Sequence, residues 1–183
     1  METFTKPREL VENPHYREQR RTCLINLNVD TLDTPLTELI QVFNQLPYCF
    51  TLQSCYGHFL YAGQNDPHNI EPLPATEIIT GVEYRIAYRA YCVENSASGK
   101  RLLRALEEVP ALNPENIHFG SADWFWNRQV NSYTLQVQPA RFMYQDKAIL
   151  GYEEALHIEQ IRNEFFVRLQ ALSQKQGSRE NSG

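Results

Sequence analysis

Residues 54–58, with the sequence SCYGH, hold the highest density of reactive side chains in the chain. The thiol of Cys55 could act as a nucleophile, with the imidazole of His58 as its base. A thiolate is populated at neutral pH only beside a positive charge or a helix N-terminus, so this interpretation depends on the neighbours of the thiol. The alternative is a β-turn in which Gly57 takes a positive φ and Cys55 is a small buried side chain. Under the first interpretation Cys55 and His58 are catalytic, while Ser54 and Gly57 contact a cofactor.

The same segment could supply two metal ligands, because a cysteine and a histidine three residues apart suit zinc. A zinc site needs further ligands, and the chain has no CxxC motif and no second pair to provide them. We therefore expect no metal ion. Without a secretion signal the thiols should stay reduced, which predicts no disulfide among the four cysteines, Cys23, Cys49, Cys55 and Cys92.

A second group of candidate residues lies at 122–128, where both tryptophans of the chain occur. If this segment is extended, alternation places Trp124 and Trp126 on one face. Such a surface could stack a nucleobase or the adenine of a cofactor, with Arg128 beside it and Asp123 as a further catalytic group. The alternative is a contribution to the core or to a dimer interface, where aromatic side chains are also common.

Basic residues form a third candidate site, for an anion or RNA. Arg85 and Arg89 should share one face of a predicted strand, about 13 Å apart at the usual rise per residue. Ser98 and Lys100 open the helix that follows, and a helix N-terminus can bind a phosphate or carboxylate. The alternatives are salt bridges for the arginines and an ordinary serine cap for the helix.

The composition is that of a globular protein. The chain has 183 residues, of which 42% are hydrophobic, and its formal net charge is −5. These values favour one domain and disfavour a protein that binds nucleic acid over its whole surface, although a local basic patch remains compatible. No apolar run is long enough for a membrane span, and the N-terminus does not have the pattern of a signal peptide. We expect a cytoplasmic protein with no membrane partner.

Hydrophobic periodicity and turn signals predict the order of the elements. Residues 22–29 alternate as in a strand, and Asp33 followed by Pro35 is typical of a helix start. Residues 82–93 alternate over a longer stretch, and residues 151–175 repeat apolar side chains at helical spacing. The other predicted elements are a helix ending at Pro47, strands at 48–52 and 58–62 around a turn at 53–57, a helix at 95–109, and strands at 116–119 and 132–138.

This order predicts a single α+β domain over residues 22–175. It follows a polar segment at 1–21 and precedes a disordered tail at 176–183. Residues 22–62 and 82–138 share the order strand, helix, strand, strand, so we expect two βαββ-like halves in a mixed or antiparallel sheet. A pseudo-two-fold axis would then bring Ser54 and Ser121 together, and residues 54–58 and 123–128 would line one cleft.

Residues 36–62 resemble the wybutosine-synthesis methyltransferase family of tRNA modification. The resemblance rests on a helix that ends at Pro47, a short strand containing Thr51, and the residues Ser54, Cys55 and Gly57 of a family Ser-Ser-Cys-Ser-Gly-Arg signature. Gln53, Tyr56 and His58 stand at the other three positions of the signature. The resemblance implies an α+β fold, S-adenosylmethionine as methyl donor and a hypermodified guanosine in tRNA as substrate.

Two functions are compatible with these patterns. The first is a nucleotide- or RNA-modifying enzyme, methyltransferase-like, whose cleft holds an unidentified small molecule or RNA and whose cofactor only the resemblance specifies. The second is a non-catalytic homodimer or ligand-binding protein that uses its aromatic faces as an interface.

Overall fold

The computed structural model describes residues 4–75 and 79–180, with side chains through residue 178. Within these ranges the strands and helices, in chain order, are β1 (Phe4–Thr5), α1 (Tyr16–Asn26), α2 (Thr37–Gln45), β2 (Cys49–Cys55), β3 (His58–Leu60), β4 (Val82–Arg85), β5 (Ala87–Val93), α3 (Ala97–Glu107), β6 (Ile117–Ala122), α4 (Asp123–Trp126), β7 (Ser132–Val137), β8 (Lys147–Leu150) and α5 (Tyr152–Glu180). Short 3₁₀ turns are η1 (Val29–Thr31), η2 (Thr34–Leu36), η3 (Val109–Leu112) and η4 (Ala140–Phe142).

The strands form two antiparallel sheets, with orders β1-β6-β7-β5-β2 and β3-β4-β8. The protein is therefore a single-domain α+β fold, as predicted, and its long C-terminal helix is α5. No helix in the described ranges combines the length and the apolar character that a bilayer crossing needs.

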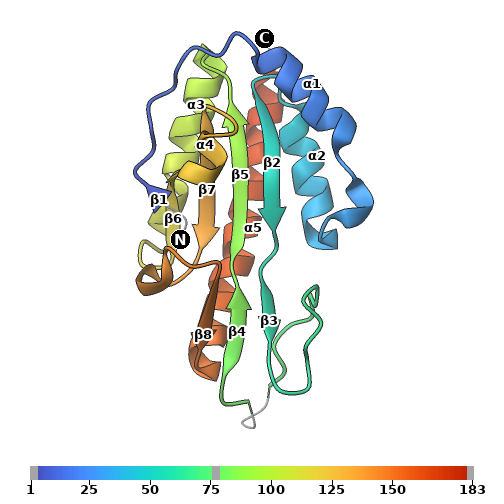
Figure 1. The fold of residues 1–183 in the computed structure, drawn as a ribbon, viewed down its shortest axis with the longest axis vertical. Helices are drawn as coiled ribbons and strands as arrows, with labels where there is room; N and C mark the ends of the chain where they lie inside the picture. The colour runs from blue at the N-terminus through green and yellow to red at the C-terminus, as the bar shows by residue number, and fades with distance from the viewer. Residues whose placement is uncertain (1–3, 76–78, 181–183) are drawn as a thin grey trace.

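A two-stranded ribbon joins the two sheets (Figure 1). Cys55 of β2 pairs with Tyr88 of β5, and His58 of β3 pairs with Arg85 of β4, so the register is continuous across the gap. The hydroxyl of Tyr84 accepts from the backbone N–H of Ala87 at 2.9 Å and donates to a β7 carbonyl at 2.9 Å. This side chain connects the three-stranded sheet to the five-stranded sheet.

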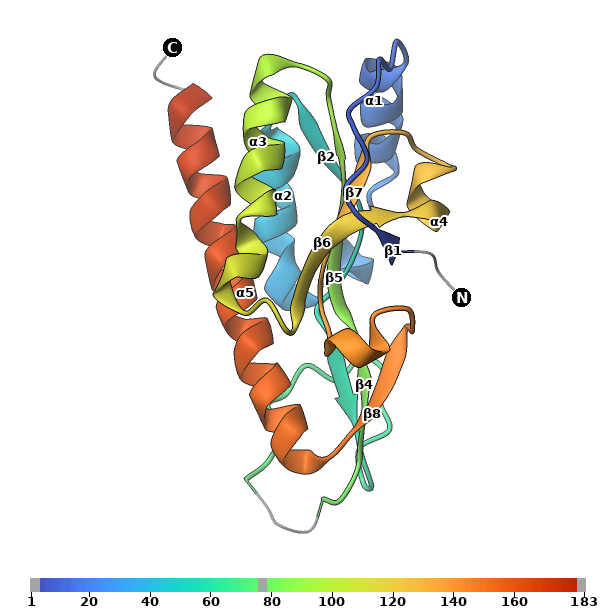
Figure 2. The same ribbon diagram turned by 90° about the vertical axis from the view of Figure 1, so that its left-hand side faces the viewer.

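Helices cover both faces of the sheets, as Figure 2 shows. Helices α2, α3 and α5 pack on one face and enclose the main core, while α1, α4 and the N-terminal segment lie on the other. The predicted apolar stripe of α5 is buried in that core: Ala155, Ile158, Ile161, Phe165, Leu169 and Leu172. The helix continues to Glu180 and buries Gln176, so the disordered tail predicted from residue 176 is wrong up to 180, and residues 181–183 lie outside the described part.

The strand predicted at 22–29 is wrong, because these residues fall largely in helix α1. Tyr16, Arg20 and Cys23 recur at helical spacing and all donate hydrogen bonds to backbone carbonyls of residues 44–51. Ile25, which the strand interpretation buries, is 75% exposed. The first half therefore begins with a helix, and the two halves do not share the order strand, helix, strand, strand.

The turn predicted at 53–57 is also wrong. Strand β2 runs on to Cys55 and pairs with β5 throughout, past a register shift between Thr51 and Gln53. The chain then passes through Tyr56 and Gly57 into β3, which pairs in the other sheet. Gly57 has a φ of +90°, a conformation that favours glycine. The predicted positive φ at this residue is confirmed.

Candidate functional site

A cavity of about 900 Å³ opens beside the ribbon, on the face that carries α4. Residues from both predicted segments line it, so the expectation of one shared cleft is confirmed in its geometry. Of the predicted site residues, Ser54, Cys55, His58, Arg85, Asp123 and Trp124 line the cavity, whereas Gly57, Arg89, Ser98, Lys100 and Arg128 do not. Other side chains in the wall include Asp33, His68, Tyr88, Thr134, Gln136 and Lys147.

Asp33, Cys55 and His58 form a compact cluster in the cavity wall. One donor atom from each residue lies within 4.8 Å of the other two. The Nε2 atom of His58 is 3.3 Å from Oδ2 of Asp33, and Nδ1 is 2.9 Å from the carbonyl oxygen of Asn69. The backbone N–H of Tyr56 donates to the Asp33 carboxylate at 2.8 Å. Carboxylate, thiol and imidazole are all common metal ligands and common proton-transfer groups.

The cluster holds His58 in its protonated form. Burial of the imidazole lowers its pKa, but hydrogen bonds to Asp33 and Cys55, together with the Asn69 carbonyl, raise the pKa to about 10. Burial raises the pKa of Asp33, yet the hydrogen bonds from His58 and Tyr56 outweigh it and leave the pKa below its usual value. The pair therefore carries opposite charges at neutral pH, beside the thiol.

This electrostatic arrangement predicts a pH-dependent stability. The folded-state pKa of His58 lies above its unfolded value of 6.5, so its stabilisation is complete below pH 6.5 and is lost as the pH rises towards 10. We expect the free energy of unfolding to fall by on the order of 1 kcal/mol between about pH 6.5 and about pH 8. Urea unfolding of the wild type and of His58→Gln at both pH values measures this. Equal pH dependence in the two proteins would contradict the assigned pKa.

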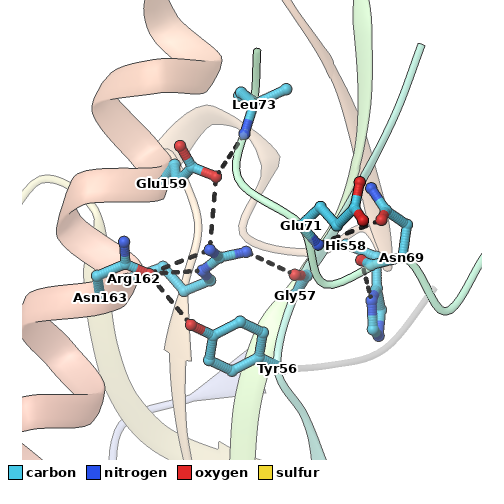
Figure 3. Close-up of polar contacts among 9 residues, drawn as sticks. All are labelled: Tyr56, Gly57, His58, Asn69, Glu71, Leu73, Glu159, Arg162 and Asn163. Atoms are coloured by element: carbon cyan, nitrogen blue, oxygen red, sulfur yellow. Dashed lines mark hydrogen bonds and ion pairs between the residues drawn. The ribbon is translucent and has the colours of Figure 1, made fainter. Parts of the chain in front are cut away.

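Helix α5 supports the β2–β3 connection from the opposite face (Figure 3). Arg162 donates from Nη1 to the carbonyl oxygen of Gly57 at 2.8 Å, and its guanidinium carbon is 4.3 Å from the ring centre of Tyr56. Glu159 lies 3.6 Å from the same guanidinium and accepts from the backbone N–H of Leu73 at 3.0 Å. These buried contacts fix the backbone that carries the cluster and the loop that follows β3.

The opposite wall of the cavity begins at α4. The segment is a helix and not the expected extended stretch, so Trp124 and Trp126 do not share a face. Trp124 is 54% exposed and lines the cavity, while Trp126 packs edge-on against Tyr133. The guanidinium carbon of Arg128 lies 3.2 Å from the ring centre of Trp124, although Arg128 itself does not line the cavity.

Charged groups lie at two further places in the cavity wall. The carboxylate of Asp123 pairs with Arg8 of the N-terminal segment. On the three-stranded sheet, Lys147 lies 2.8 Å and Arg85 3.5 Å from the carboxylate of Glu83. Lys147 and Arg85 both line the cavity, and Asp146 lines it next to Lys147, so this side carries two basic side chains and the carboxyl groups of Glu83 and Asp146.

The predicted basic patch is not formed. Arg85 is exposed at the cavity, whereas Arg89 is fully buried between Phe43 and Tyr91 and donates to a threonine hydroxyl at 2.9 Å. The extended chain is interrupted at Ile86, between β4 and β5. In β4 the even-numbered residues face the helices, whereas in β5 the odd-numbered residues do. The two arginines therefore point to opposite faces.

The start of α3 also lies apart from the cavity. Its cap is Ser96, whose hydroxyl accepts from the N–H of Gly99 at 3.1 Å. The hydroxyl of Ser98 accepts from Arg101, and Lys100 is exposed to solvent. The expected serine cap is confirmed at Ser96, while anion binding by Ser98 and Lys100 stays a prediction.

Several residues of the site are absent from the sequence-based expectations. The sequence places Asp33 only at the start of a helix, and Asp33 does directly precede η2. Its carboxylate, however, forms an ion pair with His58. Asn69 contributes only a backbone carbonyl, and Arg162 lies more than 100 residues away in the chain. The sequence offers one signal for Arg162. It directly follows Ile161 and lies at helical spacing from the other buried residues of α5, so its side chain is expected to be buried.

The chain was compared with protein families, curated proteins and solved structures. No protein-family model and no curated protein matches the chain. The solved structure of the PH1069 protein from Pyrococcus horikoshii is similar over 90% of this chain and 95% of that chain, with a TM-score of 0.49 and 12% sequence identity. Likeness at this level does not indicate a function.

Proposed function

We propose that the cavity binds a nucleotide-containing ligand, free or within RNA, and that the protein modifies it. The observation that carries this proposal is that one cavity joins an exposed indole, that of Trp124, to the cluster of Cys55 and His58. Exposed aromatic rings beside arginine are typical platforms for nucleobases. A volume of about 900 Å³ lies within the usual range of small-molecule sites.

The charges around the cavity suit a phosphate at one end. Arg85 and Lys147 lie on the three-stranded sheet beside the carboxylate of Glu83, and Asp146 lines the cavity next to Lys147. A phosphate near them would be neutralised by charge-assisted hydrogen bonds. With the base on Trp124 and the phosphate at Arg85 and Lys147, the sugar that joins them would lie near β2 and β3.

The reacting groups in this proposal are Cys55, His58 and Asp123. In this arrangement the Cys55 thiol would act as the nucleophile, and the neighbouring imidazole could accept or donate a proton. Asp123 faces the cavity from α4 and would orient the ligand as a hydrogen-bond acceptor. S-adenosylmethionine, which the family resemblance implies, would share the cavity and contact Ser54 and Trp124. The four cysteines, all in the described part, are free thiols, which suits the reducing cytoplasm that we propose as the compartment.

Nucleotide binding is expected to depend on Trp124. Base stacking on an aromatic side chain contributes about 1–3 kcal/mol, so Trp124→Ala should weaken binding roughly tenfold or more. Calorimetric titration with guanosine monophosphate and with S-adenosylmethionine measures this. A Trp126→Phe variant leaves Trp124 as the sole indole, and its fluorescence should change when either ligand binds.

Tyr144→Ala is the matched control, because Tyr144 is an exposed aromatic residue that does not line the cavity. It should bind both ligands as the wild type does. Absence of binding to the wild type, or equal losses in the two alanine variants, would contradict the proposal.

A further inference from the structure

We propose that Asp33, Cys55 and His58 hold a divalent transition-metal ion, of the zinc type, with one coordination position open to the cavity. This inference does not rest on the proposed nucleotide chemistry. The sequence predicted no metal site, because the third ligand lies 22 positions before Cys55 and belongs to no recognisable motif.

The spacing of the donor atoms fits a tetrahedral ion. Bonds of about 2.1 Å to nitrogen and oxygen place two ligand atoms about 3.4 Å apart on a tetrahedron. Nε2 of His58 and Oδ2 of Asp33 are 3.3 Å apart. The thiol of Cys55 lies within 4.8 Å of a donor atom of each of the other two residues, so a small movement of its side chain completes the set.

The donor types select the class of ion. A thiolate and an imidazole favour zinc and related first-row metals, whereas magnesium and calcium take oxygen ligands almost alone. Three protein ligands with a fourth position for water or substrate is the usual arrangement of catalytic zinc. All three side chains line the cavity, so the fourth position faces the space where a ligand would lie.

Backbone groups already orient each of the three ligands. Nδ1 of His58 meets the carbonyl oxygen of Asn69 at 2.9 Å, which leaves Nε2 to face the ion. The N–H groups of Tyr56 and Gly57 donate to the Asp33 carboxylate at 2.8 Å and to the Cys55 sulfur at 3.4 Å. Such outer hydrogen bonds accompany metal-ligating side chains and raise metal affinity.

Metal binding would change the role of Cys55 from a nucleophile to a metal ligand. The thiol and the imidazolium lose protons when they ligate the ion. With the ion in place, Cys55 is a ligand and not a nucleophile, and the atom that meets the substrate is the one in the open position. In the metal-free protein the thiol remains available.

Titration of the chelator-treated protein with Co²⁺ tests this inference, because cobalt reports its ligands by absorption. We expect one equivalent to produce a thiolate-to-cobalt charge-transfer band and intense visible bands of four-coordinate cobalt. Zn²⁺ should displace the cobalt and remove both signals. Cys55→Ser should abolish the charge-transfer band, and Asp33→Asn should weaken cobalt binding at least roughly tenfold.

Cys23→Ser is the matched control, since Cys23 is a half-buried free thiol outside the cluster. It should leave the cobalt spectrum unchanged. Circular dichroism checks that each variant is folded, and Asp33→Asn remains informative if Cys55→Ser does not fold. Absence of the band in the wild type, its persistence in Cys55→Ser, or its loss in Cys23→Ser would overturn the inference. Calorimetry with guanosine monophosphate on the metal-free protein tests the proposed function separately.

Discussion

Replacing Arg162 by methionine is expected to lower the free energy of unfolding by about 3–5 kcal/mol, the usual cost of removing one partner from a buried ion pair. The side chain is buried and meets Gly57, Glu159 and Tyr56 at once. Methionine keeps much of the apolar volume but leaves the carbonyl of Gly57 without this donor and the carboxylate of Glu159 without its cation. Urea unfolding measures the loss.

Arg168→Met provides the comparison, because Arg168 is an exposed arginine on the same helix. Its substitution should change the free energy of unfolding by less than about 0.5 kcal/mol. The double variant Arg162→Met, Glu159→Gln should be less unstable than the sum of the two single variants, because no unpaired carboxylate remains. A loss below about 1 kcal/mol for Arg162→Met would show that the ion pair and the hydrogen bond to Gly57 contribute little.

Gly57→Ala should destabilise the protein by about 2–6 kcal/mol and disturb the site. A φ of +90° strains any side chain by roughly 1–3 kcal/mol. The new Cβ would also lie 2.8 Å from the Cβ of Ala87, an overlap that costs a further 1–3 kcal/mol or so. His58 follows this residue and Cys55 lies two positions before it, so a shift of the Gly57 backbone that relieves the overlap would disturb the cluster. Unfolding free energies and the cobalt spectrum of the variant report the two effects.

Gly63→Ala separates strain from overlap. Gly63 has a similar φ of +94°, but nothing lies within 4 Å of the position of its Cβ. Its substitution should therefore cost only the strain. Adding Ala87→Gly to Gly57→Ala should recover part of the stability, since it removes the nearest atom. Equal costs for the two alanine variants would mean that the neighbour yields without penalty.

Local sequence signals were sufficient to predict helices that bury one face in the core. The stripe of α5 from Ala155 to Leu172 and the cap of α3 at Ser96 depend on residues close in sequence, and both are present in the structure. Residues 22–29 show the opposite case. Their alternation imitates a strand, but the contacts that decide for a helix are hydrogen bonds from Arg20 and Cys23 to a distant backbone. No local pattern contains them.

The same distinction holds for the candidate site. Cys55, His58 and Trp124 could be predicted to share a cleft because reactive and aromatic residue types are conspicuous in a sequence. Asp33 could not be placed beside His58, since the contact depends on how the chain before α2 packs against the connection between β2 and β3. Arg89 is the opposite case. Its charge predicted an exposed position, but the side chains of the strand change faces at Ile86, and Arg89 is therefore buried.

The long helix α5 contacts both sheets. The ribbon that joins the two sheets has only two strands, and its interruption at Gly57 and Ile86 is where a hinge would form. Helix α5 spans 29 residues, about 43 Å at the usual rise, and contacts both β7 and β4. The hydrogen bond from Arg162 to the carbonyl oxygen of Gly57 attaches this helix to the ribbon at the interruption. We therefore expect α5 to resist bending of one sheet relative to the other at Gly57 and Ile86.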